Sequence, residues 1–521
     1  MSNPKLTGQS SHHRLLVHPT SPHSPNYFGA ELTRSRGSSL QWLPLIALPL
    51  VVMTVIFSSL ASAQEDATGV LAWQSLFITG MYAPLIALFS SLPERRETTT
   101  RGGGTLWRRL DAHRENAARF GVVMLSIAAF HLLNFAGSWA AIAAQGREHH
   151  QLLLIAGLYS FFCSIGIAGL ACACARALGF AATLVAAVLW QILSVLPGTV
   201  EGNSWWACPP AWPQRLLLRS LRIHQNAVPL EPGDPLLNNS VLSAVLLCGV
   251  LAICGCCAAI VIPRPRIPLL PLLFRRRSKP QTAITANAAS TASGWQPSPH
   301  LRAHSRSTLL RTIVGINRAA FGPGLVACLV LSTAMLVFLT VVYPHDYVEG
   351  FFAFALLPLG AGLLPVIVWP LLSAAWPLVF IESPFGPRAF LVWMLGIVAA
   401  VCAVSSVAIF LAGAKASTVV VAFLLACGVG YVVASVSLAV TIRFGIVPAI
   451  ALTIVGTILS LTLGGDILAQ TPLWLVALPA WPLLATSPAR LATAALLTLL
   501  LGSSLSWCNH KLLTTQALRH R

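Results

Sequence analysis

The stretch WWACPPAWP at Trp205–Pro213 recurs as WLVALPAWP at Trp474–Pro482. Each copy follows the fifth apolar run of its half of the chain and precedes the sixth. Tryptophan favours the boundary between lipid headgroups and hydrocarbon, and proline interrupts a helix, so each copy predicts a short broken or re-entrant element. We assign the two copies to an outer gate formed by Trp205, Pro210, Trp212, Pro213, Trp474, Pro479, Trp481 and Pro482.

The composition outside these copies is that of a membrane protein. The chain has 521 residues, of which 56% are hydrophobic and 9% charged, against roughly 25% charged in soluble domains. Twelve apolar runs approach or exceed the length of about 18 residues that a spanning helix needs. They lie near 42–61, 70–92, 120–142, 152–174, 180–197, 240–262, 321–343, 350–380, 389–412, 417–440, 446–464 and 489–508. The run 350–380 contains four prolines and should be kinked or interrupted.

Two series of six runs around a repeated motif indicate a duplication. Because six is even, both halves have the same orientation in the membrane. We therefore expect an all-α integral membrane protein with about 12 transmembrane helices, arranged as two parallel six-helix repeats. The predicted parts are a cytoplasmic tail (1–41), a first repeat (42–262), a basic flexible linker (263–306), a second repeat with a preceding interfacial helix (307–510) and a cytoplasmic tail (511–521). The segment 307–320 is either that interfacial helix or an extension of the seventh span.

The net charge of +18 follows the positive-inside rule. With a cytoplasmic N-terminus, 27 of the 33 lysines and arginines fall on the cytoplasmic side. This distribution predicts a multi-pass protein of the plasma membrane with both termini in the cytoplasm, and it calls for lipid rather than nucleic acid as a partner. The 12 cysteines lie mostly within apolar runs and lack the spacing of metal ligands, so no metal site is expected.

The chain lacks the sequence features of a protein that hydrolyses ATP or couples to an ion gradient. No phosphate-binding G-x-x-x-x-G-K-[ST] motif is present, and every acidic or basic residue falls in a loop, a tail or the end of a run. We therefore expect no catalytic residue and no cofactor in this chain, and the absence of mid-membrane charge argues against coupling to an ion gradient. His131 and Asn134, one helical turn apart, either line a pathway or form a buried polar pair bonded to a neighbouring helix. The outer loops that carry Asp66 and Glu349 are too short for a glycosyltransferase site.

The residues that follow the two aromatic–proline copies differ. Arg215, Arg219 and Arg222 follow the first copy at about one-turn intervals, which predicts an amphipathic surface helix. The second copy has no such arginines, so a gate formed by both copies would be asymmetric.

Three features resemble the ABC-2-type permeases, particularly the six-helix subunits of lantibiotic and antibiotic export or immunity systems. ELTRSRGS at Glu31–Ser38 is similar to the acidic-Leu-basic entry segment of those subunits. An acidic residue closes the second run of each half and is followed by glycine and basic residues, as in the cytoplasmic loop that contacts the ATPase. The aromatic–proline element between the fifth and sixth runs resembles a motif of the same family. Two departures are that this chain is fused and that its second half lacks the entry segment.

The resemblance implies an exporter permease that moves an amphipathic substrate outward, such as a peptide antibiotic, a drug or a lipid-linked compound. Two copies of a separate ABC ATPase, which binds the ATP and Mg²⁺, would supply the energy. The implied coupling residues are Glu94, Arg95, Arg96, Glu97, Arg108, Arg109, Glu382, Gly386 and Arg388. Because the second loop is shorter, coupling is expected to be unequal between the halves. The alternatives are an ion-coupled secondary transporter of 6+6 architecture and an assembly or sensor protein without transport.

Overall fold

The computed structural model describes residues 26–60, 68–99, 110–225, 228–238, 240–263, 308–342, 344–464 and 468–518. Throughout these residues the regular structure is helical, with no strand. Eight of the described helices are long and apolar enough to cross a membrane, or nine if α4 and α5, which are bent by 55° at their junction, form one span. The protein is thus an all-α multi-pass membrane protein, as its composition predicts. Shorter apolar helices occupy the three remaining expected positions, Ala182–Val195, Cys328–Val341 and Ile446–Leu461.

The helices of the first half are α1 (Tyr27–Ser35), α2 (Ser39–Trp42), η1 (Leu43–Ile46), α3 (Ala47–Leu60), α4 (Thr68–Gly80), α5 (Tyr82–Thr99), α6 (Ala112–His131), η3 (Leu132–Ala136), α7 (Gly137–Ala143), α8 (Gln151–Leu178), α9 (Phe180–Val195), α10 (Pro197–Val200), η4 (Trp205–Ala207), α11 (Ala211–Leu221), α12 (Pro235–Asn238) and α13 (Val241–Val261). The helices of the second half are α15 (Leu309–Ala320), α16 (Pro323–Val342), α17 (His345–Phe351), η5 (Phe352–Leu356), α18 (Leu357–Leu372), α19 (Trp376–Glu382), α20 (Gly386–Leu411), α21 (Ala416–Phe444), α22 (Ile446–Leu463), η6 (Leu468–Gln470), η7 (Pro472–Leu475), η8 (Leu478–Ala480), α23 (Trp481–Leu484) and α24 (Pro488–Leu518). The segments η3 and η5 are π-helical.

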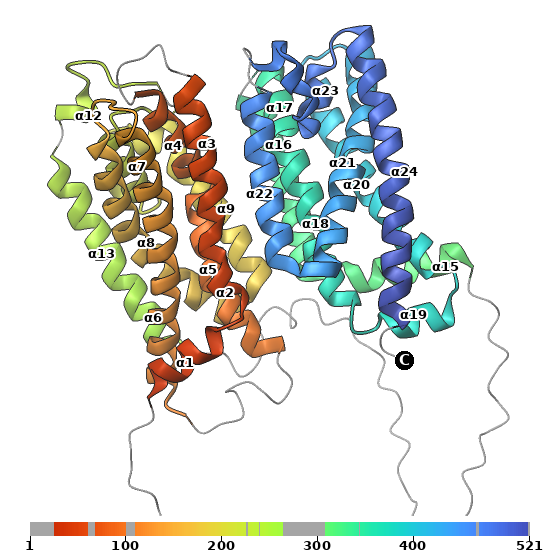
Figure 1. Ribbon diagram of the computed structural model, residues 1–521, viewed down its shortest axis with the longest axis horizontal. Coiled ribbons are helices and arrows are strands. Elements are labelled where there is room, and N and C mark those ends of the chain that lie inside the picture. The colour runs from red at the N-terminus through yellow and green to blue at the C-terminus, as the bar shows by residue number, and fades with distance from the viewer. Residues whose placement is uncertain are drawn as a thin grey trace, which may run out of the picture.

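The helices form two bundles that lie side by side, one from each half (Figure 1). The helices α1, α15 and α19 lie at one end of the molecule, and α12, α17 and α23 lie at the other (Figure 1). The bundles touch where α9 packs against α16. Side chains of α18 and α22, such as Val366 and Ile450, belong to the same buried apolar cluster as the core of the first bundle.

Corresponding helices pack together in the two halves. In the first half α5 packs against α8 and α9, and α8 against α13; in the second half α18 packs against α21 and α22, and α21 against α24. The links α8–α9 and α21–α22 are each a single glycine, Gly179 with φ 92° and ψ 171° and Gly445 with φ 94° and ψ −178°. Residues that have a side chain rarely adopt these backbone angles, so glycine is required at both links.

Small residues allow α8 and α13 to approach closely. An added Cβ at Gly169 would lie 2.2 Å from the carbonyl oxygen of Gly255, and one at Gly166 would lie 2.7 Å from the carbonyl oxygen of Leu251. This contact is a backbone-to-backbone approach of the kind that glycine permits between membrane helices.

The structure changes the expected limits of both tails. Residues 27–35 of the supposed N-terminal tail form α1, which packs against α6. Its N-cap is Asn26, whose side chain accepts a hydrogen bond from the backbone N–H of Gly29 (2.8 Å). At the other end of the chain, α24 continues to Leu518, so residues 511–518 extend a spanning helix. Residues 1–25 and 519–521 of the tails and residues 264–306 of the expected linker lie outside the described residues.

Two local expectations are settled by the backbone. The segment before the seventh span is a helix of its own, because α15 ends at Ala320 and α16 begins only at Pro323. The long run near 350–380 starts earlier, at His345, and is interrupted after Leu372. It resumes as α19, with Pro377 in the first turn, where proline needs no backbone hydrogen bond.

Candidate functional site

Eight charged side chains form a buried cluster at one end of the first bundle, which we name the charge network. Its members are Glu31, Arg34, Glu94, Arg96, Glu97, Glu115, Arg119 and Arg176. They come from α1, α5, α6 and α8. Four carboxylates therefore face four guanidinium groups.

The side of the network nearest α1 joins this helix to α5. Arg34 lies 2.9 Å from Glu31 on its own helix and also pairs with Glu97 on α5. Arg96 of α5 pairs in return with Glu31. The side chain of Glu97 is fully buried (0% exposed). The pairing is reciprocal, so each helix supplies both a donor and an acceptor to the other.

The inner side of the network joins α5 to α6 and α8. Arg119 donates to both carboxylate oxygens of Glu94 (3.1 and 3.0 Å) and to Glu115 (2.5 Å). Arg176 lies 3.6 Å from Glu94 and donates to the carbonyl oxygen of Ala259 at the end of α13. A buried ion pair is costly to desolvate, and removing one partner leaves an uncompensated charge that costs about 3–5 kcal/mol. The network therefore holds the ends of α5, α6 and α8 together.

Some of the expected coupling residues of the first half belong to the charge network. Glu94, Arg96 and Glu97 are members, while Arg95 places its guanidinium carbon 4.9 Å from the ring centre of Phe180 on α9. Arg108 and Arg109 lie outside the described residues. Sequence reasoning missed Arg119 and Arg176, which fall within or at the end of apolar runs and have no motif around them.

The corresponding place in the second half is formed by α15, the end of α19 and the start of α20. Helix α15 packs against α20 as α1 does against α6. Its contacts include a hydrogen bond between the hydroxyls of Thr312 and Ser383 (2.8 Å) and a hydrogen bond from the indole N–H of Trp393 to the side-chain oxygen of Asn317 (2.9 Å). Of the expected residues, Glu382 ends α19, and Gly386 and Arg388 lie in the first turn of α20.

In both aromatic–proline elements the last tryptophan donates a hydrogen bond to the start of the element. The indole N–H of Trp212 donates to the carbonyl oxygen of Trp206 (2.9 Å), and that of Trp481 donates to the carbonyl oxygen of Trp474 (3.1 Å). Trp481 is almost fully buried (1% exposed). The prolines at 213 and 482 occupy the first turn of α11 and α23, where no backbone donor is needed.

An arginine covers the first tryptophan of each element. Arg215 lies 4.9 Å from the ring centre of Trp205, and Arg490 lies 5.3 Å from that of Trp474. Arg215 also donates to the carbonyl oxygen of Val200 (2.6 Å). Burial lowers the pKa of the Arg215 guanidinium from its usual value, an effect that Glu201 opposes. The second copy thus obtains from α24 the cation that its own sequence lacks.

The helix after the first copy is not a surface helix, contrary to the expectation from its arginines. Helix α11 packs against α4, α8, α9 and α13, and most of its residues are buried. The side-chain amide of Gln214 donates to the carbonyl oxygen of Ile78 (2.8 Å), in the last turns of α4. The buried face of α11 is wider than its sequence pattern indicated because polar groups such as Gln214 find partners inside the bundle.

Gln191 of α9 stabilises the break between α4 and α5. Its side-chain oxygen accepts from the backbone N–H of Ala83 (2.8 Å), and its amide donates to the carbonyl oxygens of Ile78 (3.1 Å) and Thr79 (2.6 Å). A broken helix in hydrocarbon must satisfy its freed backbone groups within the protein. A glutamine from the fifth expected span therefore supplies partners that the bent second span lacks, and Gln214 of α11 supplies a further one.

The proposed pathway pair is buried in the core of the first bundle. The amide of Asn134 donates to Gln74 (3.3 Å), whose own amide donates to Thr54 (3.2 Å) and Ser138 (3.1 Å). His131 stacks on Phe135, with ring centres 6.0 Å apart. Asn134 thus follows the alternative expectation of a polar group bonded to a neighbouring helix.

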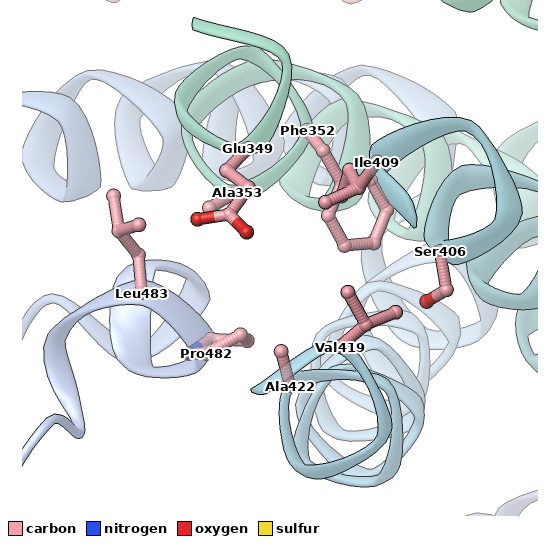
Figure 2. A pocket seen from close by; sticks show the side chains of 9 residues that line it. All are labelled: Glu349, Phe352, Ala353, Ser406, Ile409, Val419, Ala422, Pro482 and Leu483. Atoms are coloured by element: carbon pink, nitrogen blue, oxygen red, sulfur yellow. The ribbon is translucent and has the colours of Figure 1, made fainter. Parts of the chain in front are cut away.

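A small pocket adjoins the second aromatic–proline element. Glu349 points its carboxylate into this pocket, which Pro482 and Leu483 border on the opposite side (Figure 2). The pocket volume is about 30 Å³, about the share of one water molecule in the liquid. Glu349 lies on α17 and not in a loop as expected, because this helix begins at His345.

Comparison of the chain with family models, curated proteins and solved structures gives no match. The resemblance to ABC-2-type permeases therefore rests on the sequence features alone.

Proposed function

We propose that this chain is the membrane-spanning permease of an ABC exporter and that the charge network receives the movement of a separate ATPase. The observation that carries the proposal is an ion pair between two segments named in the resemblance, the entry segment and the C-terminal end of α5. The entry segment lies 63 residues from Glu97 in the sequence, yet Arg34 and Glu97 are ion-paired. Such a pairing gives an external partner one rigid surface made of α1 and the end of α5.

Helix α5 connects this surface to the far side of the bundle. Its C-terminal turns carry Glu94 and Glu97, and its N-terminus follows the break that Gln191 and Gln214 hold. Its 18 residues span about 27 Å. Gln214 belongs to α11, which starts in the first aromatic–proline element. A displacement at the charge network would thus reach the proposed outer gate through one helix.

The proposal includes two parallel six-helix repeats and twelve spans. It is supported by the matching helix pairs, by the single-glycine links at Gly179 and Gly445, and by the similar placement of α1 and α15. The shorter loop around Glu382 would make coupling unequal between the halves. Substrate export, the plasma membrane location and cytoplasmic termini belong to the same proposal. ATP and Mg²⁺ would bind to the partner, which supplies phosphoanhydride hydrolysis.

The test uses inside-out membrane vesicles from cells that contain the chain and its ATPase. ATP should drive uptake of an amphipathic cationic peptide into these vesicles. Charge reversal at Arg95, Arg96, Arg108 and Arg109 together should abolish uptake while ATP hydrolysis and membrane insertion remain. The matched control is Arg114→Glu, because Arg114 is an exposed arginine (66% exposed) close to the same loop. Uptake driven by a sodium or pH difference with the purified chain alone would refute the proposal.

One observation favours the alternative of an ion-coupled carrier. Glu349 places a carboxylate in a pocket sized for one water or one small cation, beside the second aromatic–proline element (Figure 2). In this alternative, Glu349→Gln would abolish transport driven by an ion gradient, whereas Asp346→Asn, which changes an exposed carboxylate in the same turn, would not. In the exporter, Glu349→Gln would leave ATP-driven uptake intact.

A further inference from the structure

A cavity of about 270 Å³ lies between α8, α11 and α13, at the end of the first bundle that carries the aromatic–proline element. Its apolar wall includes Leu152, Ile155 and Leu216, and its charged wall consists of Arg219 and Arg222. The volume equals roughly nine water molecules at liquid density. It is therefore much larger than a gap filled by one or two structural waters.

The two arginines have N–H donors available for a ligand. Arg219 donates to the carbonyl oxygen of Leu237 (2.8 Å), a bond that uses one of its five N–H groups. Arg222 is exposed, and its side chain has no hydrogen-bond or ion-pair partner among the described residues. Its backbone is left-handed (φ 56°) at the C-cap of α11, which fixes where the side chain leaves the helix.

The nearby carboxylates are engaged elsewhere. Glu201 lies 3.2 Å from Nδ1 of His224, and Asp234 lies 3.3 Å from Nε2 of the same ring. The backbone N–H groups of Gln225 and Leu236 also donate to Glu201 (3.2 Å) and Asp234 (2.7 Å), so both acids have partners in the adjoining loop. Glu231 completes the acidic residues of this segment and is exposed.

The surface beside the cavity is strongly apolar. Leu158 on α8 is 68% exposed, and Leu242 and Leu246 on α13 are 63% and 61% exposed. Side chains of this kind on spanning helices face lipid. The cavity therefore combines a lipid-facing apolar wall with two guanidinium groups at the end of the helices.

We propose that this cavity binds an acidic phospholipid, with the phosphate on Arg219 and Arg222 and an acyl chain along Leu152, Ile155 and Leu216. Guanidinium groups match phosphate oxygens in charge and geometry. A soluble anion would use the arginines but not the apolar wall, and a neutral lipid would use only the wall. This inference is independent of the exporter proposal.

The test measures phosphatidylglycerol binding to the purified chain in neutral detergent by native mass spectrometry, with phosphatidylcholine as the comparison lipid. Arg222→Gln should weaken phosphatidylglycerol binding about fivefold, and the double variant with Arg219→Gln about twenty-fivefold, from the contribution of one arginine at a lipid surface. Lys415→Gln is the matched control, because it removes one exposed charge between α20 and α21 and should leave binding unchanged.

A second pair of variants tests the apolar wall without changing charge. Ile155→Trp fills the cavity and should weaken binding, whereas Leu158→Trp, on the lipid-facing surface of the same helix, should not. Equal affinity in wild type and Arg222→Gln, or equal affinity for the two lipids, overturns the proposal. Displacement of the lipid by inorganic phosphate also overturns it, because the site would then recognise a soluble anion. If a variant elutes abnormally from a gel-filtration column, the test rests on Arg222→Gln alone, because the Arg222 side chain makes no hydrogen bond or ion pair with the described residues.

Discussion

Neutralising Glu97 tests whether the charge network holds α1 to the bundle. Glu97→Gln keeps the shape of the side chain but leaves four guanidinium groups facing three carboxylates. A buried pair that loses one partner costs about 3–5 kcal/mol. Arg34 keeps 26% of its side chain exposed, so water compensates part of the loss and the lower limit of about 3 kcal/mol is expected.

Hydrogen exchange of the α1 amides reports this energy directly, because local opening of α1 exposes them. A loss of about 3 kcal/mol corresponds to roughly hundredfold faster exchange. The double variant Arg34→Gln/Glu97→Gln restores the balance of charges and should recover about 1–2 kcal/mol of that loss.

The matched control is Asp111→Asn, which breaks the exposed pair with Arg114 (3.4 Å) next to the network. An exposed pair contributes less than about 1 kcal/mol, so the exchange of α1 should stay near that of the wild type. If Glu97→Gln leaves α1 as protected as in the wild type, the network does not hold this helix and the coupling surface has no basis. The same follows if Asp111→Asn has an equal effect.

Gly169→Ala should lower the temperature of unfolding strongly, by a destabilisation of about 3 kcal/mol, because the new Cβ would meet a carbonyl oxygen of α13 at 2.2 Å. Gly396→Ala, where an added Cβ meets nothing within 4 Å, should leave thermal unfolding unchanged, and equal effects would contradict the close approach of α8 and α13. Gln191→Leu should cost about 2 kcal/mol or more by leaving the N–H of Ala83 unpaired and should change the 55° bend between α4 and α5. Distances between spin labels on these helices measure the bend, and Gln151→Leu, at an exposed position of α8, should not alter them.

Hydrophobicity made the spanning helices predictable. A run of apolar residues has one low-energy form in lipid, so α8, α13, α20 and α21 lie close to the expected ranges. The proline-rich run was correctly expected to be interrupted. It breaks after Leu372 and resumes with Pro377 in the first turn of α19, whereas Pro365 and Pro370 lie inside α18. These features depend on local chemistry.

The parts that sequence reasoning missed depend on partners distant in the chain. The sequence of α1 resembles a polar tail because the position of this helix comes from ion pairs with α5, 63 and 65 residues away. Arg119 and Arg176 join the same network from positions that no motif marks. In the sequence, Gln214 fits the polar face of a surface helix. Its burial becomes favourable because its amide donates a hydrogen bond to the carbonyl oxygen of Ile78.

The dependence of the α4–α5 break on Gln191 has a consequence for biosynthesis. Residues 68–99 leave the ribosome well before α9, so the backbone groups near Ala83 enter the lipid without their later partner. Unsatisfied groups there cost several kcal/mol each. The nascent segment should therefore enter the translocon as one straight helix and acquire its angle only when residues 180–195 have been synthesised. Chains truncated before that point would contain an unbent second span.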